Sequence, residues 1–285
     1  PLLIEIMGQY DISVVLGSKN RKKLIKATIE SIRKNKFNGS IEIIVVDGGS
    51  TDGTCDWLAE QTDVITIIQP NYTTTNDKGI KCKAHSWGEF MNIGFKYSHA
   101  DYIVMVSDDL ILAPGCLQKG YDELKGRIGH GEKIGGGAFY FREYPRHDYY
   151  RVIMLPKGYI NINHGFYYKP ALEDVNWLDE INYFFYCGDG DISMRLNENG
   201  WKTIPLDECY AAHLVHLPVN KKKIPKWKLI DMDTFDKLYP YKCLGDTMEK
   251  TCINAKIDTS AFWKYALKNV LCGYLLKMYD NYIRK

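Results

Sequence analysis

Short apolar runs alternate with amphipathic stretches along the first part of the chain. Apolar runs of this length are typical of strands buried on both faces of a sheet. They predict strands at residues 12–16, 41–46, 64–68 and 102–106. The stretches between them carry apolar side chains at helical spacing. They predict helices at 21–35 and 87–97, and a further helix that includes residues 57 and 58. Strands that alternate with helices favour an α/β fold with a mainly parallel central sheet flanked by helices.

The second part of the chain is less regular. Aromatic and β-branched residues predict strands around 139–141, 149–155 and 159–168. A helix at 192–199 ends before Gly200, a residue that commonly follows the last turn of a helix. Residues 217–260 show no clear pattern, and helical spacing returns at 260–283. We therefore expect one globular unit over residues 1–217 and a partly helical extension over 218–285.

The charge of the chain is nearly balanced, with 37 Lys and Arg against 35 Asp and Glu and a formal net charge of +2. A charge this small does not attract polyanions over the whole surface, so no nucleic-acid partner is expected. Aromatic residues make up 13% of the chain and include 21 tyrosines. Their faces suit sugar rings, although tyrosine-rich cores are common too.

The 8 cysteines form no CxxC pair and are irregularly spaced. That pattern argues against a disulfide framework and a thiolate zinc site, and favours reduced thiols in a cytoplasmic protein. The first ten residues lack the features of a signal peptide. No apolar run reaches the roughly 20 residues that a membrane-spanning helix needs.

Polar residues follow three of the predicted strands directly. Gly17-Ser18, Asp47-Gly48-Gly49 and Asp108-Asp109 stand at these strand ends. In parallel sheets, ligands bind beyond the carboxyl ends of the strands. The sequence therefore predicts that these segments form one binding site.

The segment 47–54 (DGGSTDGT) has two interpretations. Its glycines let the backbone approach a ligand closely, and Asp47 can accept hydrogen bonds from a base or a ribose. Ser50 to Asp52 can equally cap the following helix in an ordinary strand–turn–helix connection. The octet by itself leaves both interpretations open.

Adjacent carboxylates at Asp108 and Asp109 repel each other unless they are solvated or bound to a cation. Mg²⁺ and Mn²⁺ favour such oxygen ligands, and a metal ion here would neutralise the charge on a leaving diphosphate. The alternative is a solvated turn that leads into Pro114-Gly115.

A third acidic segment, Gly188-Asp189-Gly190-Asp191, lies between aromatic residues and a predicted helix. A carboxylate there can take the proton from an attacking hydroxyl. We expect Asp189 to do this and Asp191 to cap the helix, so both are candidate catalytic-site residues. His213 and His216 follow at a spacing of three and can contact a metal or a phosphate; the alternative is a structural role.

Taken in order, these segments resemble the family 2 glycosyltransferases, which are inverting enzymes with the GT-A fold. The family's first strand, similar to SVVIPTYNR, is matched by Ser13 to Arg21, and its VDDGSTDGT by Val46 to Thr54. Its helix motif ending in N-x-G is matched by Asn92-Ile93-Gly94, and its metal motif with a following PG by 106–109 and 114–115. Its FDE and EDxDLxxR stretches are matched by 178–180 and 188–195. The resemblance covers about residues 11–217.

The resemblance implies a GT-A catalytic domain over 1–217, with a nucleotide-binding half at 11–115 and an acceptor half at 116–217. It implies a nucleotide-sugar donor, commonly UDP-linked, and a saccharide or lipid-linked acceptor. The donor-binding residues that it implies are Gly17, Ser18, Asn20, Arg21, Asp47, Gly49, Lys83, Asn92, Ser107 and Asp108.

The resemblance also implies a Mn²⁺ or Mg²⁺ ion held by Asp108, Asp109 and His213, and a base at Asp189 beside Asp191. Three acids of the family motifs are replaced here, by Val106, Gly48 and Gly188. The first replacement places the metal mainly on Asp108, and the last makes Asp189 the expected base.

Two rival functions remain. A nucleotidyltransferase that makes nucleotide-sugars also uses acidic metal ligands, but it needs a glycine-rich basic loop that residues 17–21 do not provide. A non-catalytic sugar-binding relative is the other. The extension at 260–285 either docks on the domain or contacts the inner face of a membrane peripherally. Self-association into a homo-oligomer is also compatible with the sequence.

Overall fold

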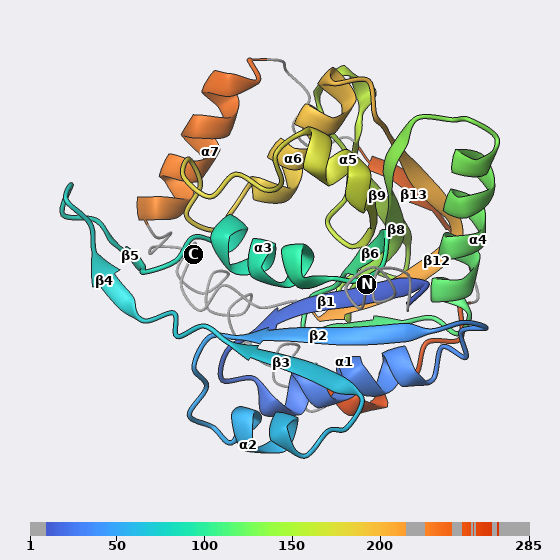
Figure 1. Cartoon of the computed structure of the whole chain (residues 1–285), viewed down its shortest axis with the longest axis horizontal. Coiled ribbons are helices and arrows are strands. Elements are labelled where there is room, and N and C mark those ends of the chain that lie inside the picture. Colours follow the sequence, from blue (N-terminus) through green and yellow to red (C-terminus); the bar gives the residue numbers. More distant parts are fainter. Residues whose placement is uncertain are drawn as a thin grey trace, which may run out of the picture.

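The computed structural model describes residues 10–214, 226–240, 247–251, 253, 255–263 and 267. Their centre is a mixed sheet with helices on both faces (Figure 1). One half of this sheet is parallel, in the order β6-β1-β2-β3, and its strands are β1 (Ile12–Ser18), β2 (Ile41–Asp47), β3 (Val64–Ile68) and β6 (Tyr102–Met105). The helices between them are α1 (Lys22–Arg33), α2 (Thr54–Ala59) and α3 (Trp87–Tyr97). The predicted strands and helices of this half are confirmed.

The other half of the sheet is mostly antiparallel. It continues from β6 in the order β11-β8-β9-β10, with β13 paired to β9. These strands are β8 (Ile134–Tyr144), β9 (Tyr150–Met154), β10 (Ile160–Asn161), β11 (Gly165–Tyr168) and β13 (Thr247–Lys250). The long β12 (Lys202–Leu214) runs parallel to β8 and also pairs with β7 (Leu110–Leu112). The predicted α/β class is therefore correct, although the strand directions differ between the halves.

The core lies on both faces of the sheet because alternate residues of each strand point to opposite sides. Val14 and Leu16 of β1 belong to one apolar cluster, together with residues of α1 and of α4 (Cys116–Gly129). Val15 belongs to the other cluster, with residues of α3, α5 (Lys169–Asp174) and α6 (Gly188–Glu198). All three side chains are 0% exposed, so β1 is sandwiched between two layers of helices.

The glycine run 135–137 shows why β8 needs small residues. A Cβ on Gly136 would lie 2.4 Å from the Phe166 carbonyl oxygen, and one on Gly137 would lie 2.5 Å from Leu206 Cγ. The neighbouring chain therefore approaches β8 too closely for a side chain at these two positions. The strand itself, Ile134–Tyr144, extends well beyond the predicted residues 139–141.

Several elements differ from the sequence-based expectation. The helix predicted at 192–199 begins four residues earlier, at Gly188. A helix, α7 (Lys226–Leu238), lies in the stretch 217–260 that showed no pattern; its buried residues are only Asp231 and Phe235, so it carries no apolar stripe. Other elements not predicted are α4, α5, β7, β12, β13 and the hairpin of β4 (Thr73–Thr75) and β5 (Lys81–Lys83). Two short 3₁₀ turns, η1 (Pro156–Gly158) and η2 (Ser260–Phe262), complete the list.

The start of the predicted C-terminal helix docks on the sheet. Phe262 of η2 is 0% exposed and packs with Leu24, Ile111 and Leu214. Trp263 and Leu267 are exposed, and most of the predicted helix 260–283 lies outside the described residues. No helix in the described part of the chain combines the length and the apolar character needed to cross a bilayer.

Candidate active site

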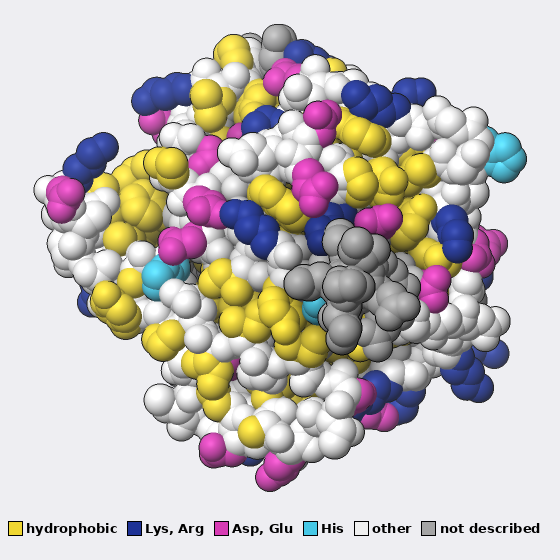
Figure 2. Space-filling view, in the orientation of Figure 1, with side chains coloured by type: hydrophobic (Ala, Val, Ile, Leu, Met, Phe, Trp, Pro, Cys, Tyr) yellow, Lys and Arg dark blue, Asp and Glu magenta, His cyan; other side chains and the backbone are white. Residues whose placement is uncertain are grey.

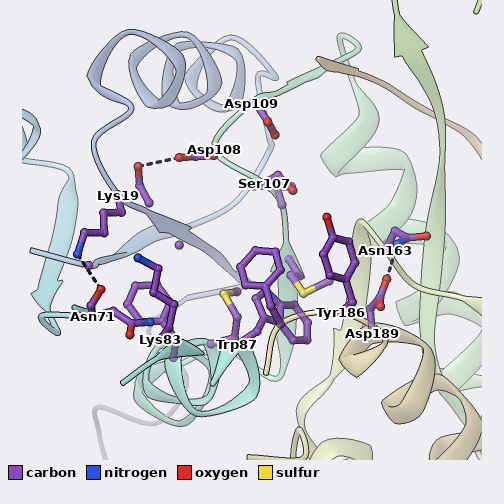
Figure 3. A pocket seen from close by; sticks show the side chains of 18 of the residues that line it. Lys19, Asn71, Lys83, Trp87, Ser107, Asp108, Asp109, Asn163, Tyr186 and Asp189 are labelled. Carbon is purple, nitrogen blue, oxygen red and sulfur yellow. Dashed lines mark hydrogen bonds between the residues drawn. The ribbon is translucent and has the colours of Figure 1, made fainter. Parts of the chain in front are cut away.

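A cavity of about 640 Å³ opens at the carboxyl ends of β1, β2 and β6. Figure 3 shows Lys19, Asn71 and Lys83 on one side of it, Asn163 and Asp189 on the other, and Ser107, Asp108 and Asp109 along a third. The cavity thus joins two of the three predicted acidic segments, and Gly48 brings the third to its edge. Its predicted lining residues are Gly17, Ser18, Arg21, Lys83, Ser107, Asp108, Asp109, Asp189 and His213.

The two adjacent acids are held by hydrogen bonds from the end of β1 and from the residue that precedes α1. Arg21 donates from Nη1 to Asp108 Oδ1 at 2.7 Å and from Nη2 to Asp109 Oδ2 at 2.5 Å. Ser18 Oγ donates to Asp108 Oδ2 at 2.7 Å. Both carboxylates are nearly inaccessible, at 3% and 2% exposure. Buried charges need such partners, so Arg21 compensates most of the repulsion that the sequence pointed to.

His213 approaches the same pair from β12, with Nε2 3.2 Å from Asp109 Oδ1. Behind it lies His164, whose ring centroid is 5.2 Å from that of His213. Burial, together with the neighbouring imidazole, lowers the pKa of His164 to about 3, so this ring is neutral. His164 was missed by sequence reasoning; the only local signal is the Asn-Ile-Asn-His run in a segment predicted as strand.

The predicted metal ligands lie together, and the two carboxylates among them are held by Arg21. Asp108, Asp109 and His213 offer the oxygen and nitrogen ligands that Mn²⁺ accepts, but Arg21 holds both carboxylates. Within the described residues, no three or more His, Cys, Asp or Glu side chains are placed so that they could hold a metal ion. The metal therefore stays a prediction.

Two lysines add positive charge at the same end of the cavity. Lys19 Nζ donates to the Asn71 carbonyl oxygen at 2.7 Å, and Lys83 stands on the β4–β5 hairpin. Gly17 lines the cavity where there is no room for a side chain, because a Cβ there would lie 2.8 Å from the Phe90 ring. Cations beside a strand end with little side-chain bulk suit a phosphate-containing ligand.

Asp189 stands at the other end, in the first turn of α6. Asn161 Nδ2 donates to Asp189 Oδ2 at 3.3 Å, and Asn163 Nδ2 donates to the same oxygen. The surrounding protein desolvates the carboxyl, which raises the pKa of Asp189 despite these hydrogen bonds. A carboxylate with a raised pKa that lines a cavity is suited to accept a proton.

Asp191 was predicted to cap the helix at the catalytic site, and the structure corrects this prediction. It is 2% exposed and does not line the cavity. Its Oδ2 accepts from Arg195 Nε at 2.7 Å, and its Oδ1 accepts from the hydroxyls of Tyr183 and Tyr239 at 3.2 and 2.9 Å. The helix begins at Gly188, so Asp191 lies inside it and does not cap it.

Asn92 also points away from the cavity. Its Nδ2 donates to the Leu178 carbonyl oxygen at 2.9 Å and to Glu180 Oε1 at 2.7 Å, and its Oδ1 accepts from Leu178 N at 3.1 Å. The amide is 1% exposed. Asn92 therefore ties α3 to residues 178–180 and has no free face for a donor, which corrects the prediction.

Three further predicted donor contacts shape the loops around the cavity without lining it. Asp47 is 0% exposed and accepts from Ser50 N and Ser50 Oγ, both at 2.7 Å. Asn20 Oδ1 accepts from Thr51 N at 2.7 Å, which joins the first loop to the segment 47–54. Gly49 turns the chain with φ +76° beside Pro70. The segment is an organised turn, and Gly48 within it lines the cavity, so its role in binding a donor stays a prediction.

The remaining wall of the cavity is aromatic and was not predicted as part of the site. It includes Trp87 of α3, residues 184–186 before α6, and Trp227 of α7. Trp227 comes from beyond residue 217, where the sequence placed the end of the catalytic unit. Trp227 lies in a stretch without hydrophobic periodicity, so the sequence gives no signal that places it at the site.

The fold and this arrangement define a class of α/β proteins with a GT-A sheet and a cavity at its strand ends. The chain belongs to glycosyl transferase family 2: the model of that family, described as "Glycosyl transferase family 2", matches residues 13–178. No curated protein matches the chain by sequence.

Solved structures with the same fold include S. aureus TarS 1-349 in complex with UDP, with a TM-score of 0.54 and 16% identity over 72% of this chain and 60% of that chain. TarS 1-349 in complex with UDP-GlcNAc has a TM-score of 0.52 and 14% identity over 75% and 61% of the two chains. Mannosyltransferase PcManGT from Pyrobaculum calidifontis, in complex with GDP-Man and Mn²⁺, has a TM-score of 0.51 and 13% identity over 75% and 59%. The chain thus spans about three fifths of the length of these solved chains and 37% of a longer TarS chain, and at such identities the likeness shows the fold alone.

Proposed function

We propose that the protein is an inverting glycosyltransferase that moves a sugar from a nucleotide-sugar, with UDP as the nucleotide, to a hydroxyl of a saccharide or a lipid-linked glycan. One observation carries this proposal: a single cavity has Lys19, Arg21 and Lys83 at one end and the half-buried, desolvated Asp189 carboxyl at the other. The first end suits a diphosphate and the second suits an acceptor hydroxyl. Family membership favours this activity over the nucleotidyltransferase.

The donor is expected at the cationic end. The backbone at Gly17 and Gly48 lines the cavity where a nucleoside would enter beside the strand ends. Lys19 and Lys83 then neutralise the diphosphate, whose negative charge grows as it leaves, while Arg21 balances the charge of Asp108 and Asp109 beside it. UDP is favoured because UDP and UDP-GlcNAc are the ligands named for the similar TarS structures.

Asp189 is the proposed base for the acceptor. As the acceptor oxygen forms its bond to the anomeric carbon, its proton passes to the Asp189 carboxylate. The bond from that carbon to the diphosphate oxygen breaks on the opposite face, and the nucleoside diphosphate departs with the bonding electron pair. One displacement of this kind inverts the anomeric centre and needs no enzyme nucleophile. Asn161 and Asn163 orient the carboxylate through its Oδ2.

Metal assistance is a separate part of the proposal. Mn²⁺ is named for the similar mannosyltransferase, and Asp108, Asp109 and His213 are its predicted ligands in this chain. Because Arg21 already holds both acids, no step of the reaction above is assigned to a metal, and the metal requirement is a quantity to measure.

The test has two stages. Thermal shift with UDP and GDP, with and without Mn²⁺, identifies the nucleotide. Release of that nucleotide from a panel of its sugars, with saccharides and lipid-linked glycans as acceptors, then measures transfer. We expect Asp189→Asn to lower transfer by at least about 10³-fold, as loss of a general base does, and to bind the nucleotide as wild type does.

The matched control is Asp122→Asn, an exposed acid on α4, which should transfer at the wild-type rate. Transfer that survives Asp189→Asn shows that another group is the base. If neither nucleotide shifts the melting temperature, the donor site is wrong, and if the nucleotide binds without transfer to any acceptor, the chain is a binding relative.

A further inference from the structure

Three aromatic side chains on the acceptor side of the cavity are only partly covered. Phe185 is 51% exposed and Tyr186 is 40% exposed, and with Trp227 they line the cavity. The Tyr186 and Trp227 rings are stacked, with centroids 5.6 Å apart and an interplanar angle of 18°, and Phe185 meets Trp227 edge-on at 6.0 Å. We call these three residues the aromatic platform.

The aromatic platform is built from two segments that are far apart in sequence and tightly joined. Asp231 of α7 is 0% exposed, and its carboxylate accepts the backbone N–H groups of Phe184, Phe185 and Tyr186 at 2.8, 2.9 and 2.8 Å. A carboxylate that holds three successive amides fixes their segment firmly. The platform is therefore preorganised before any ligand arrives.

The same helix is anchored to the helix that carries the proposed base. Phe235 packs over Gly190, where a Cβ would lie 3.1 Å from its ring, and the Tyr239 hydroxyl donates to Asp191 Oδ1 at 2.9 Å. Asp189 is one residue from Gly190, and it lies beside Tyr186 in Figure 3. The position of the platform relative to Asp189 is thus set by packing and hydrogen bonds, not by a flexible loop.

The surroundings of the aromatic platform favour a sugar over a purely apolar ligand. On the face drawn in Figure 2, hydrophobic side chains gather around the end of α7 nearest the β4–β5 hairpin, with basic and acidic side chains interspersed around them. Lys228 Nζ lies 4.1 Å from the centroid of the Tyr186 ring, and Asp189 and Asn163 line the adjoining wall. Flat apolar faces beside polar groups match a pyranose ring, which has a C–H face and a rim of hydroxyls.

We infer that the aromatic platform of Phe185, Tyr186 and Trp227 is the acceptor subsite and binds a pyranose ring of the acceptor, so that one of its hydroxyls reaches Asp189. This inference rests on the proposed function, because it takes Asp189 as the base. Trp227 supplies the main stacking surface, and the Tyr186 hydroxyl supplies a polar tip. The nucleobase and the phosphates of the donor are expected at the opposite, cationic end of the cavity.

Saturation-transfer NMR on the full chain tests the inference. The probes are the methyl glycosides of glucose, galactose, mannose and N-acetylglucosamine, and octyl β-glucopyranoside below its micellar concentration, each with UDP present. We expect saturation of the ring C–H protons of at least one methyl glycoside. Trp227→Ala should weaken that binding by about 10-fold, the effect of losing one stacked ring, and Tyr186→Ala should weaken it as well.

Two controls separate the subsite from general effects. Tyr97→Ala removes a tyrosine of similar exposure, 49%, that does not line the cavity, and it should bind glycosides as wild type does. Trp227→Phe keeps an aromatic face and should retain part of the binding. The thermal shift with UDP should be unchanged in all these variants, which also shows that they fold.

Four outcomes overturn the inference. They are equal glycoside binding in wild type and Trp227→Ala, no glycoside binding where UDP binds, saturation confined to the octyl chain, and equal losses of UDP and glycoside binding. Failure of the proposed function is recognised by a different result, namely that UDP gives no thermal shift. Glycoside binding that depends on Trp227 in that case still supports a sugar site on the platform.

Discussion

Asp189 is the proposed base, and its neighbours change the proton affinity of its carboxyl group. The surrounding protein desolvates it and raises its pKa, while the Asn161 and Asn163 amides stabilise the charged form through hydrogen bonds. The desolvation is the larger effect, so the carboxylate gains proton affinity. A general base has to accept a proton readily, and the raised pKa favours this.

The pH profile of transfer should therefore reveal Asp189. Only the carboxylate form accepts a proton, so kcat/KM falls as the pH drops through the pKa of Asp189, which lies above its ordinary value of 3.8. Asn163→Ala removes a hydrogen bond to the charged form and should move this acid limb to still higher pH. An acid limb at the value of a water-exposed aspartate, unmoved in Asn163→Ala, would contradict the assignment.

The same shift has a consequence for stability. Between the unfolded and the raised folded pKa, the folded state binds more protons than the unfolded state, so the stability contribution of Asp189 is lost as the pH rises through that window. Where the carboxyl is ionised, its desolvated charge is therefore a cost to the stability of the fold. Asp189→Asn should accordingly melt at or above the wild-type temperature while transfer is lost.

Asp191 should respond in the opposite way. Its carboxylate is buried and accepts from Arg195, Tyr183 and Tyr239, so Asp191→Asn should lower the free energy of unfolding by about 2–4 kcal/mol. Urea unfolding measures this loss. Nucleotide binding by the folded fraction should be close to that of wild type. A variant of normal stability that fails to transfer would show that Asp191 takes part in the chemistry after all.

At the scale of elements, the loops after β1 and β6 meet because these strands are parallel neighbours. Arg21, just before α1, reaches across to Asp108 and Asp109 in the turn after β6. The two elements are thus joined by opposite charges at the point where the sequence predicted a metal ion. The guanidinium and a divalent cation would compete for the same carboxylates.

Removal of that guanidinium should favour a metal. Arg21→Ala is expected to bind Mn²⁺ about 10-fold more tightly than wild type, the effect of removing one nearby positive charge worth about 1.4 kcal/mol, and to bind UDP more weakly when no metal is present. Mn²⁺ titration followed by electron paramagnetic resonance measures the first quantity. Lys23→Ala, an exposed lysine on α1, is the control. Unchanged Mn²⁺ binding in Arg21→Ala would show that these acids are not metal ligands.

At the scale of the whole molecule, residues beyond 217 are part of the packed structure. Phe235 of α7 and Tyr239, which follows that helix, belong to an apolar cluster with Leu155, Tyr183 and Met194, and Phe262 is buried against the sheet. The division into a catalytic domain at 1–217 and an extension at 218–285 thus separates segments that share a core, and it remains to be tested. Membrane contact through 260–285 and self-association also stay predictions.

A chain ending at residue 217 should therefore be less stable than the full chain. It loses Asp231, which holds three backbone amides, and exposes the partners of Phe235 and Phe262. Burial of side chains of this size contributes about 1.5–3 kcal/mol each, so the melting temperature should drop by several degrees. A chain of residues 1–217 that melts as the full chain does would support the predicted boundary.

Much of the parallel half of the sheet could be predicted from the sequence alone. The strands β1, β2, β3 and β6 and the helices α1 and α3 are encoded locally, because apolar runs and helical spacing report burial directly. The sequence also placed Asp108, Asp189 and His213 at one site, through the order of strand ends and motifs, and the structure brings these three side chains to one cavity.

The tertiary structure decided which polar residues face that cavity. Asp189 and Asp191 are two residues apart, but successive residues turn by about 100° around a helix, so one lines the cavity and the other points to α7. Trp227 reaches the same cavity only because Asp231, Phe235 and Tyr239 dock its helix on α6. Local sequence patterns report which residues are buried in an element. They do not report which neighbour each side chain meets, because that depends on contacts between segments far apart in the chain.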